Sequence, residues 1–166
     1  MKAPGEGFND LCAGLGEVRH ALYLLLLAFQ EAKHDRTPCN TRKACKNPGP
    51  DHPITIERNL NRVVVKAAGR VIASTNLALT LKEATYPPVY YIPRGDADMT
   101  LLARTDQTTH CPYKGDANYF SIPSGGERSV NAVWTYEDPH PAVSAIKDHL
   151  AFYPSRVDLI EEQHAE

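Results

Sequence analysis

The stretch from Thr108 to Asp116 holds the densest set of reactive side chains in the chain, with an imidazole, a thiol and an ammonium close together. A thiol becomes a nucleophile where nearby positive charge favours its thiolate. His110 is adjacent to Cys111, and a turn after the cysteine would fold the Lys114 ammonium back toward the sulfur. The stretch therefore predicts a catalytic Cys111. A buried apolar role beside a proline remains the alternative, because free cysteine is among the most buried residue types.

Lys114 and Thr109 offer polar groups to a ligand. Lysine presents a point charge to a phosphate or a carboxylate, and the glycine that follows it lets the backbone approach a bound molecule. The alternative is a surface turn with a solvated lysine. The stretch is not a phosphate-binding P-loop, because it lacks that motif's glycines and the Ser or Thr after the lysine.

A second group of candidates, from Trp134 to Glu137, combines aromatic rings with a carboxylate. On a strand, Trp134 and Tyr136 share one face and Glu137 points to the other until the strand ends. Aromatic faces with one carboxylate suit the wall of a site for a flat ligand. We expect Tyr90 to stack on the same ligand, and Glu137 or His110 to move a proton. The alternative is that Trp134 is simply the largest core residue.

Two sets of residues contain side chains that could bind a metal ion, but the surrounding sequence does not match that of a known metal site. Asp96 and Asp98 could hold Mg²⁺, as nucleotide-transferring enzymes require. The sequence Pro93-Arg94-Gly95 breaks the strand just before them, so a helix cap at Asp96 explains these residues better. A possible zinc set has irregular spacing and lacks paired Cys-x-x-Cys knuckles: His34, Cys39, Cys45 and His52. We predict no metal site, and the sequence names no cofactor.

Short strands must position these residues. Thirteen prolines and ten glycines in 166 residues favour many turns, and apolar and polar residues alternate with period two after residue 46. This pattern predicts a mostly β, small antiparallel fold with one or two short helices. Helical turns are expected at 96–102, capped by Asp96, and at 142–147. Residues 76–84 fit either a short helix or an irregular strand. The predicted strands are 54–57, 62–67, 70–74, 89–92, 119–122, 129–136 and 149–153.

A change in composition near residue 46 divides the chain. Residues 37–50 are polar, basic and interrupted by proline and glycine, which is typical of a linker. We predict an N-terminal extension over residues 1–45, mostly mobile, with a helix near 17–33. Residues 46–166 are predicted to form a single globular β-rich domain.

Charge and cysteine usage restrict the partners and the compartment. The net charge is −2, whereas nucleic acids and anionic membranes select basic surfaces, so neither is expected as a partner. The apolar run 21–29 has nine residues, and a helix needs about 20 to cross a bilayer. Three of the four cysteines lie in the first 45 residues, unlike a secreted disulfide framework, which predicts a cytoplasmic protein. The oligomeric state is left open.

The motifs together resemble a known family, domain-of-unknown-function family 427, over about residues 47–158. The most specific matching segments are PPVYYIP at 87–93, THCPYKGD at 109–116 and WTYEDP at 134–139. The resemblance implies a β-tent-like fold, in which two antiparallel sheets lean together and which often holds zinc through paired cysteines. The matching region has a single cysteine, Cys111, so zinc is not carried over. The family's nucleotidyltransferase-like label has no supporting motif here.

Three hypotheses of function result. The first is a cleft between the two sheets that binds or transforms an anionic or aromatic small molecule. Its binding residues would be Tyr90, Thr109, Lys114, Trp134 and Tyr136, and its catalytic residues His110, Cys111 and Glu137. The second is a non-catalytic module that grips a peptide or a modified side chain. The third is a magnesium-dependent nucleotidyltransferase that uses Asp96 and Asp98.

Overall fold

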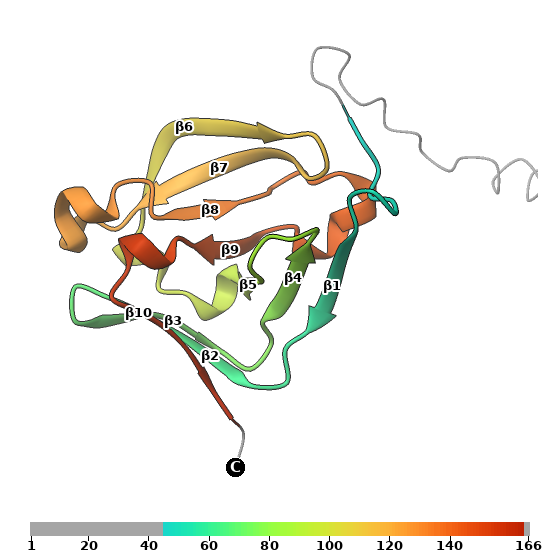
Figure 1. Cartoon of the computed structure of the whole chain (residues 1–166). Coiled ribbons are helices and arrows are strands. Elements are labelled where there is room, and N and C mark those ends of the chain that lie inside the picture. Colours follow the sequence, from blue (N-terminus) through green and yellow to red (C-terminus); the bar gives the residue numbers. More distant parts are fainter. Residues whose placement is uncertain (1–44, 165–166) are drawn as a thin grey trace, which may run out of the picture. The chain divides into compact units, whose positions relative to one another are not determined.

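A computed structural model describes residues 45–164 of the chain (Figure 1). The predicted extension over residues 1–45, with its helix at 17–33, lies outside the described residues except for Cys45. His34 and Cys39 of the considered zinc set also lie outside them. Those expectations therefore stay predictions. Within residues 45–164, no helix has the length and apolar character needed to span a bilayer.

The described residues form two antiparallel sheets, which confirms the predicted mostly β fold class. The larger sheet has seven strands in the order β1-β4-β5-β9-β8-β7-β6, and the smaller has three in the order β10-β2-β3. Figure 1 shows the smaller sheet beside one side of the larger one. The strands are β1 (Ile54–Arg58), β2 (Arg62–Ala67), β3 (Arg70–Thr75), β4 (Leu79–Glu83), β5 (Val89–Pro93), β6 (Ala103–Cys111), β7 (Gly115–Ser121), β8 (Val133–Thr135), β9 (His149–Phe152) and β10 (Leu159–Gln163).

Short 3-10 helices connect several of the strands: η1 (Arg94–Asp96), η2 (Met99–Leu101), η3 (Pro123–Ser129), η4 (Pro141–Ile146) and η5 (Pro154–Arg156). The helical turn expected at 142–147 corresponds to η4. The predicted cap at Asp96 is wrong. Asp98 caps η2 by accepting a hydrogen bond from the Thr100 N–H at 3.0 Å, whereas Asp96 accepts one from the Thr75 hydroxyl at 2.5 Å.

The β2–β3 hairpin forms as its sequence predicts. A two-residue connection, Ala68 and Gly69, joins two alternating runs, and both residues have positive φ, 50° and 70°. Positive φ at both central positions matches the right-handed twist of paired strands. The turn sets the register next to it, with Ala67 opposite Arg70, and an irregularity between Val65 and Lys66 shifts the register farther along, so that Val63 lies opposite Thr75.

Several strands depart from the prediction. β6 was not among the predicted strands; its sequence ARTDQTTHC is polar, and residues 106–109 are all exposed. It is nevertheless the edge strand of the larger sheet, where a polar sequence protects against unwanted pairing. β10 follows the strand predicted to be the last. Residues 76–84 contain β4 rather than a helix, and the predicted strand 129–136 shortens to β8 because η3 extends to Ser129.

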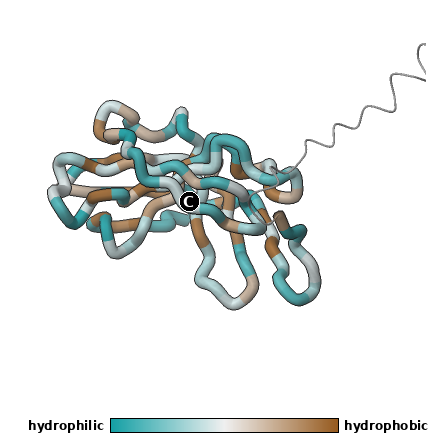
Figure 2. The backbone as a smooth tube through the Cα atoms, turned by 90° about the horizontal axis from the view of Figure 1, so that it is seen from above, coloured by the Kyte–Doolittle hydropathy of each residue, from teal (hydrophilic) through white to brown (hydrophobic). Residues whose placement is uncertain are grey.

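The two faces of the larger sheet bury different sets of side chains. One face packs on the smaller sheet and forms the inter-sheet core, which includes Val65, Ile72, Ile92, Val133 and Leu150, each at most 1% exposed. The other face carries a second apolar cluster. Hydrophobic and hydrophilic stretches alternate along the tube in Figure 2, as strands with two different faces require.

The inter-sheet core yields a stability prediction. Ile72→Ala removes a side chain that is 1% exposed, so we expect the free energy of unfolding to fall by about 2–4 kcal/mol. Val71→Ala on the same strand changes a side chain that is 50% exposed, and its effect should stay within about 0.5 kcal/mol. Urea unfolding of both variants is the measurement. Equal losses would show that the smaller sheet does not pack as described.

Candidate functional site

The seven-stranded sheet curls until residues from its two ends meet. Lys114 lies in the turn between β6 and β7 at one end, and Glu83 ends β4 near the other. The Lys114 ammonium donates a hydrogen bond to the Glu83 carboxylate. Beside this pair, the rings of His52 and Tyr113 stack with centroids 3.9 Å apart and planes 6° from parallel. These contacts close one end of a concave sheet face.

Aromatic side chains line the concave face. Leu79 pairs with Tyr91, and Ala151 pairs with Trp134, which in turn pairs with Tyr119. Since side chains alternate along each strand, laterally paired residues point to the same face. The second apolar cluster joins this row to residues from both ends of the sheet, including Ile56 of β1 and Cys111 of β6. We name as the aromatic hollow the residues Tyr91, Cys111, Tyr119, Trp134, Tyr136 and Tyr153.

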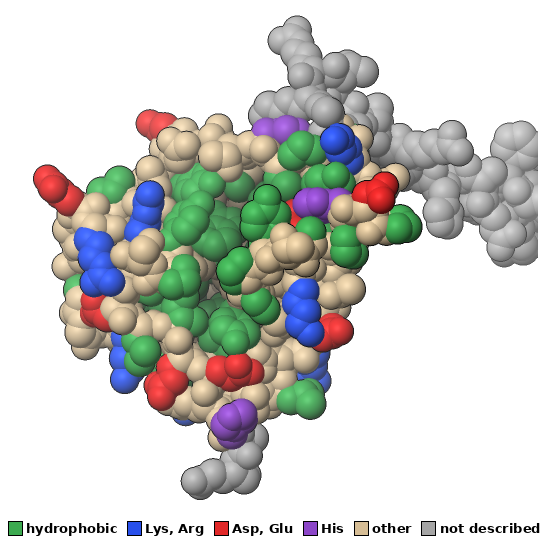
Figure 3. Space-filling model, viewed as in Figure 1, with side chains coloured by type: hydrophobic (Ala, Val, Ile, Leu, Met, Phe, Trp, Pro, Cys, Tyr) green, Lys and Arg blue, Asp and Glu red, His purple; other side chains and the backbone are tan. Residues whose placement is uncertain are grey.

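The aromatic hollow is open to solvent. Trp134, Tyr153 and Cys111 are partly exposed, whereas Tyr91 behind them is 1% exposed. Figure 3 shows hydrophobic side chains gathered around a depression in this face of the molecule. The predicted cleft between the two sheets is wrong, because the inter-sheet core fills that space. The open surface lies on the opposite face of the larger sheet.

Ring contacts hold Trp134 in place. Its ring lies 4.5 Å from the Tyr153 ring, tilted by 44°, and 6.5 Å from the Tyr91 ring, nearly perpendicular at 87°. The indole N–H also donates a long hydrogen bond of 3.4 Å to the Tyr91 hydroxyl. Edge-to-face and tilted pairs are favoured aromatic geometries. The indole is therefore positioned before any ligand arrives.

The tyrosines of the hollow are neutral hydrogen-bonding groups. Burial, reinforced by the nearby Glu83 charge, raises the pKa of Tyr91 and of Tyr136 far above its ordinary value. Burial and a hydrogen bond to Tyr119 raise the pKa of Tyr153 to about 12. The Tyr119 hydroxyl lies 2.8 Å from that of Thr109. Neutral phenols can donate to a ligand as well as accept from it.

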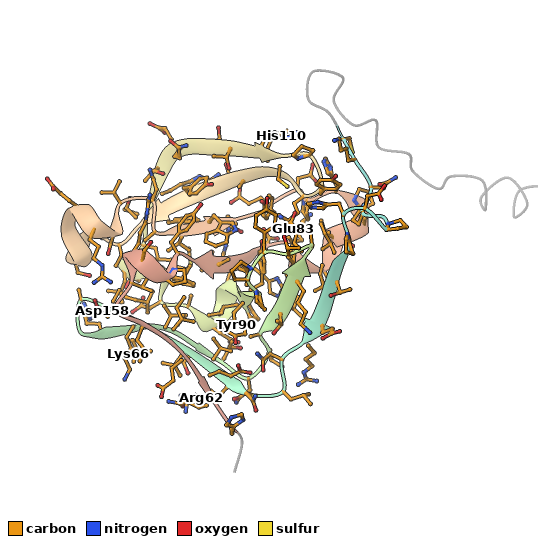
Figure 4. The ribbon with its side chains drawn as sticks, viewed as in Figure 1. Arg62, Lys66, Glu83, Tyr90, His110 and Asp158 are labelled. Atoms are coloured by element: carbon orange, nitrogen blue, oxygen red, sulfur yellow. The ribbon has the colours of Figure 1, made fainter. Side chains whose placement is uncertain are left out.

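A charged group closes the hollow at one end, formed by His52, Glu83 and Lys114 and named here the polar end. Lys114 is 8% exposed, and one Glu83 oxygen accepts its hydrogen bond while the other lies 3.0 Å from the His52 Nε2 atom. Burial alone would raise the pKa of Glu83, but the bonds from His52 and Lys114 outweigh it and lower the pKa. Glu83 is therefore ionised. Figure 4 places it at the end of β4, close to the other strands of the curled sheet.

Several predicted site residues do come together. Cys111, Trp134 and Tyr136 share the aromatic hollow, and Thr109 reaches it through Tyr119. Lys114 belongs to the polar end, whose Glu83 charge acts on the tyrosines of the hollow. The motifs at 109–116 and 134–136 therefore contribute to one surface.

Glu137 lies on the opposite face of the sheet. Its carboxylate accepts a hydrogen bond of 3.0 Å from Asn118, which stands between Ala117 and Tyr119, two residues that point into the second cluster. Alternation directs Asn118 away from that cluster. Arg104 donates two hydrogen bonds, 2.7 and 2.9 Å, and Arg94 one of 3.1 Å. The bonds from these arginines hold the pKa of Glu137 at about 2, which leaves a weak proton acceptor.

Two more predicted residues lie away from the hollow. His110 precedes Cys111 on β6 and so points to the other face, where its Nδ1 atom lies 2.7 Å from an Asp116 oxygen. Figure 4 shows His110 at the outer strand. Tyr90 packs against the inter-sheet core, and its hydroxyl donates a 2.7 Å hydrogen bond to Glu162. That bond raises the pKa of Tyr90. The aromatic residue of β5 in the hollow is its neighbour, Tyr91.

Sequence reasoning missed five residues of this surface: His52, Glu83, Tyr91, Tyr119 and Tyr153. Tyr91 was recognisable only as one of two alternating tyrosines, and nothing distinguished the inward one. Glu83 ends a short strand without any motif, and its role depends on sheet curvature that no local pattern encodes. His52 was considered as a zinc ligand together with Cys45, but its imidazole contacts Glu83 and Tyr113, while Cys45 is exposed.

Comparison with protein families agrees with the sequence motifs. The model of the family described as Domain of unknown function (DUF427) matches residues 55–163, which is more than half of the chain. The chain belongs to this family, as the resemblance implied. No curated protein sequence matches it.

The carboxylate on the opposite face gives a prediction about acid stability. The pKa of Glu137 in the folded chain, about 2, is below its ordinary value of 4.5. Its stabilisation is present above pH 4.5 and is lost as the pH falls toward 2. Glu137→Gln should lower the free energy of unfolding by about 1 kcal/mol at neutral pH, a figure discounted for partial exposure.

The same variant should also weaken the pH dependence of stability below pH 4.5. Thermal unfolding followed by circular dichroism from neutral pH down to acid pH measures both effects. Glu127→Gln, at an exposed position in η3, is the matched control and should behave as the native chain does. An unchanged acid profile in Glu137→Gln would contradict the four-bond arrangement around this carboxylate.

Proposed function

We propose that this member of the DUF427 family binds a small aromatic molecule that carries an anionic or hydrogen-bond-accepting group. The ring of the ligand contacts Trp134 and Tyr153 in the aromatic hollow, and its polar group faces the ammonium of Lys114. Tyrosine hydroxyls along the hollow supply further donors. A hollow with an apolar wall and a few convergent polar groups is the usual form of a small-molecule site.

One observation carries this proposal. The larger sheet has two apolar faces; the smaller sheet covers one, and the other leaves the indole of Trp134 and the phenol of Tyr153 partly exposed. A ligand that covers these rings removes their remaining apolar surface from water, which favours binding, since an enclosed aromatic side chain buries about 150–250 Å². The polar end places charged groups at one end of this surface, so the ring and the polar group of a ligand have separate places to bind.

Binding is better supported than nucleophilic chemistry at Cys111. The two cations that could favour its thiolate both interact with carboxylates: Lys114 with Glu83, and His110 with Asp116 on the other face. The sulfur instead shares a cluster with Tyr91 and Tyr136. Cys111 serves in this proposal as part of the wall. Asp96 and Asp98, needed by the nucleotidyltransferase hypothesis, instead bond to Thr75 and Thr100.

Fluorescence of the single tryptophan tests the proposal directly, because Trp134 lies in the hollow. We expect the aromatic anion 8-anilinonaphthalene-1-sulfonate to bind the native chain with energy transfer from Trp134. Tyr153→Ala removes the ring nearest the indole and should weaken binding about fivefold, or roughly 1 kcal/mol. Tyr86→Ala, at a tyrosine that is 65% exposed outside this cluster, is the control. The proposal fails if the dye binds without energy transfer, or if both variants weaken it equally.

Alkylation of cysteine gives a second, independent test. Bound dye should slow the reaction of Cys111 with iodoacetamide, because the ligand covers the wall of the hollow, whereas the exposed Cys45 should react at an unchanged rate. Peptide mapping by mass spectrometry separates the two sites. Cys111→Ser should retain dye binding. Loss of binding in that variant would restore a direct role for the thiol.

A further inference from the structure

The Lys114 ammonium retains hydrogen-bonding capacity that the described residues do not use. An ammonium has three N–H donors, and within residues 45–164 the Glu83 carboxylate is the one acceptor bonded to it. The side chain of Lys114 is only 10% exposed. Buried polar groups in proteins normally find partners. Two donors held at the end of an apolar hollow therefore point to an acceptor on the ligand.

The charges of the polar end limit what that acceptor can be. Lys114 and ionised Glu83 balance each other, and His52 adds one positive charge when it is protonated. The group can thus balance at most one negative charge. A second negative charge on the ligand would lie close to the Glu83 carboxylate, and like charges in a partly buried site repel strongly. The nearby Lys46 ammonium lies over the Tyr113 ring, 5.9 Å from its centre, and within residues 45–164 it is not among the groups paired with Glu83.

We propose that the ligand is an aromatic monocarboxylate, and that Glu83 acts as the specificity residue that excludes dianionic groups such as phosphate monoesters. The proposal rests on the function proposed above and names its substrate class. The ring lies against Trp134, and the carboxylate accepts the two remaining N–H donors of Lys114. A neutral amide fills the same space with a weaker, uncharged acceptor.

Three probes with the same ring and different head groups test this inference in the full chain: benzoate, benzamide and phenyl phosphate. Titrations at neutral pH are followed by Trp134 fluorescence and by calorimetry. We expect benzoate to bind about tenfold more tightly than either of the other two, as charge-assisted hydrogen bonds allow. Equal affinities would overturn the monocarboxylate inference and leave the aromatic hollow as a binding site. No binding of any probe would overturn both.

Variants of Glu83 and Lys114 test whether these residues cause the preference for benzoate. Glu83→Gln combined with Lys114→Met removes both charges without leaving one buried alone, and should abolish the preference for benzoate over benzamide. Glu83→Gln alone should shift the preference toward phenyl phosphate. Lys82→Met, at a neighbouring exposed lysine paired with Glu57, is the control and keeps the native order. A benzoate preference that survives in the double variant would contradict the role of Lys114.

Discussion

The pairing of Lys114 with Glu83 is the interaction on which the rest of this structure depends. Lys114 is 8% exposed, and burial of an ammonium is costly unless a carboxylate beside it balances the charge. Its partner ends β4, whereas Lys114 lies in the β6–β7 turn, at the far end of the seven-stranded order. The contact joins the two ends of the strand order, so the sheet that carries it is curled. The curled sheet is concave, and the concavity holds the aromatic hollow.

Much of the fold was predictable, because local patterns encode it. The alternating runs of β1, β2, β3, β5 and β9 predict their own strands, and Ala68-Gly69 predicts its hairpin. β6 was not predicted because it is a polar edge strand. Its pairing with β7, rather than its composition, makes it a strand. The candidate site was predictable in part. Cys111, Lys114 and Trp134 stand in dense motifs, but which face each occupies depends on register and on curvature. Glu137 is an example, because it directly follows Tyr136 in the sequence and yet its side chain lies on the opposite face of the sheet.

The charged residues on the two faces of the larger sheet differ in how fully their hydrogen-bonding groups are used within the chain. Arg94, Arg104 and Asn118 surround Glu137 on the face away from the hollow, where four hydrogen bonds tie β6, β7 and η1 to the end of β8. The Glu137 carboxylate in that cluster thus receives its hydrogen bonds from residues of the chain itself. The polar end differs, because Lys114 has unused N–H donors among the described residues and lies beside partly exposed aromatic rings. Unused donors next to an apolar surface are the features that distinguish a ligand site from a structural ion pair.

The location of the ligand is tested most directly by nuclear magnetic resonance of the full chain titrated with benzoate. The single indole N–H signal, that of Trp134, reports on the hollow without assignment of the rest. The account predicts that this signal and the amides of Cys111 and Lys114 shift together and saturate, while those of Asn118 and Glu137 stay in place. Shifts confined to the Asn118–Glu137 face, with an unmoved indole signal, would contradict it.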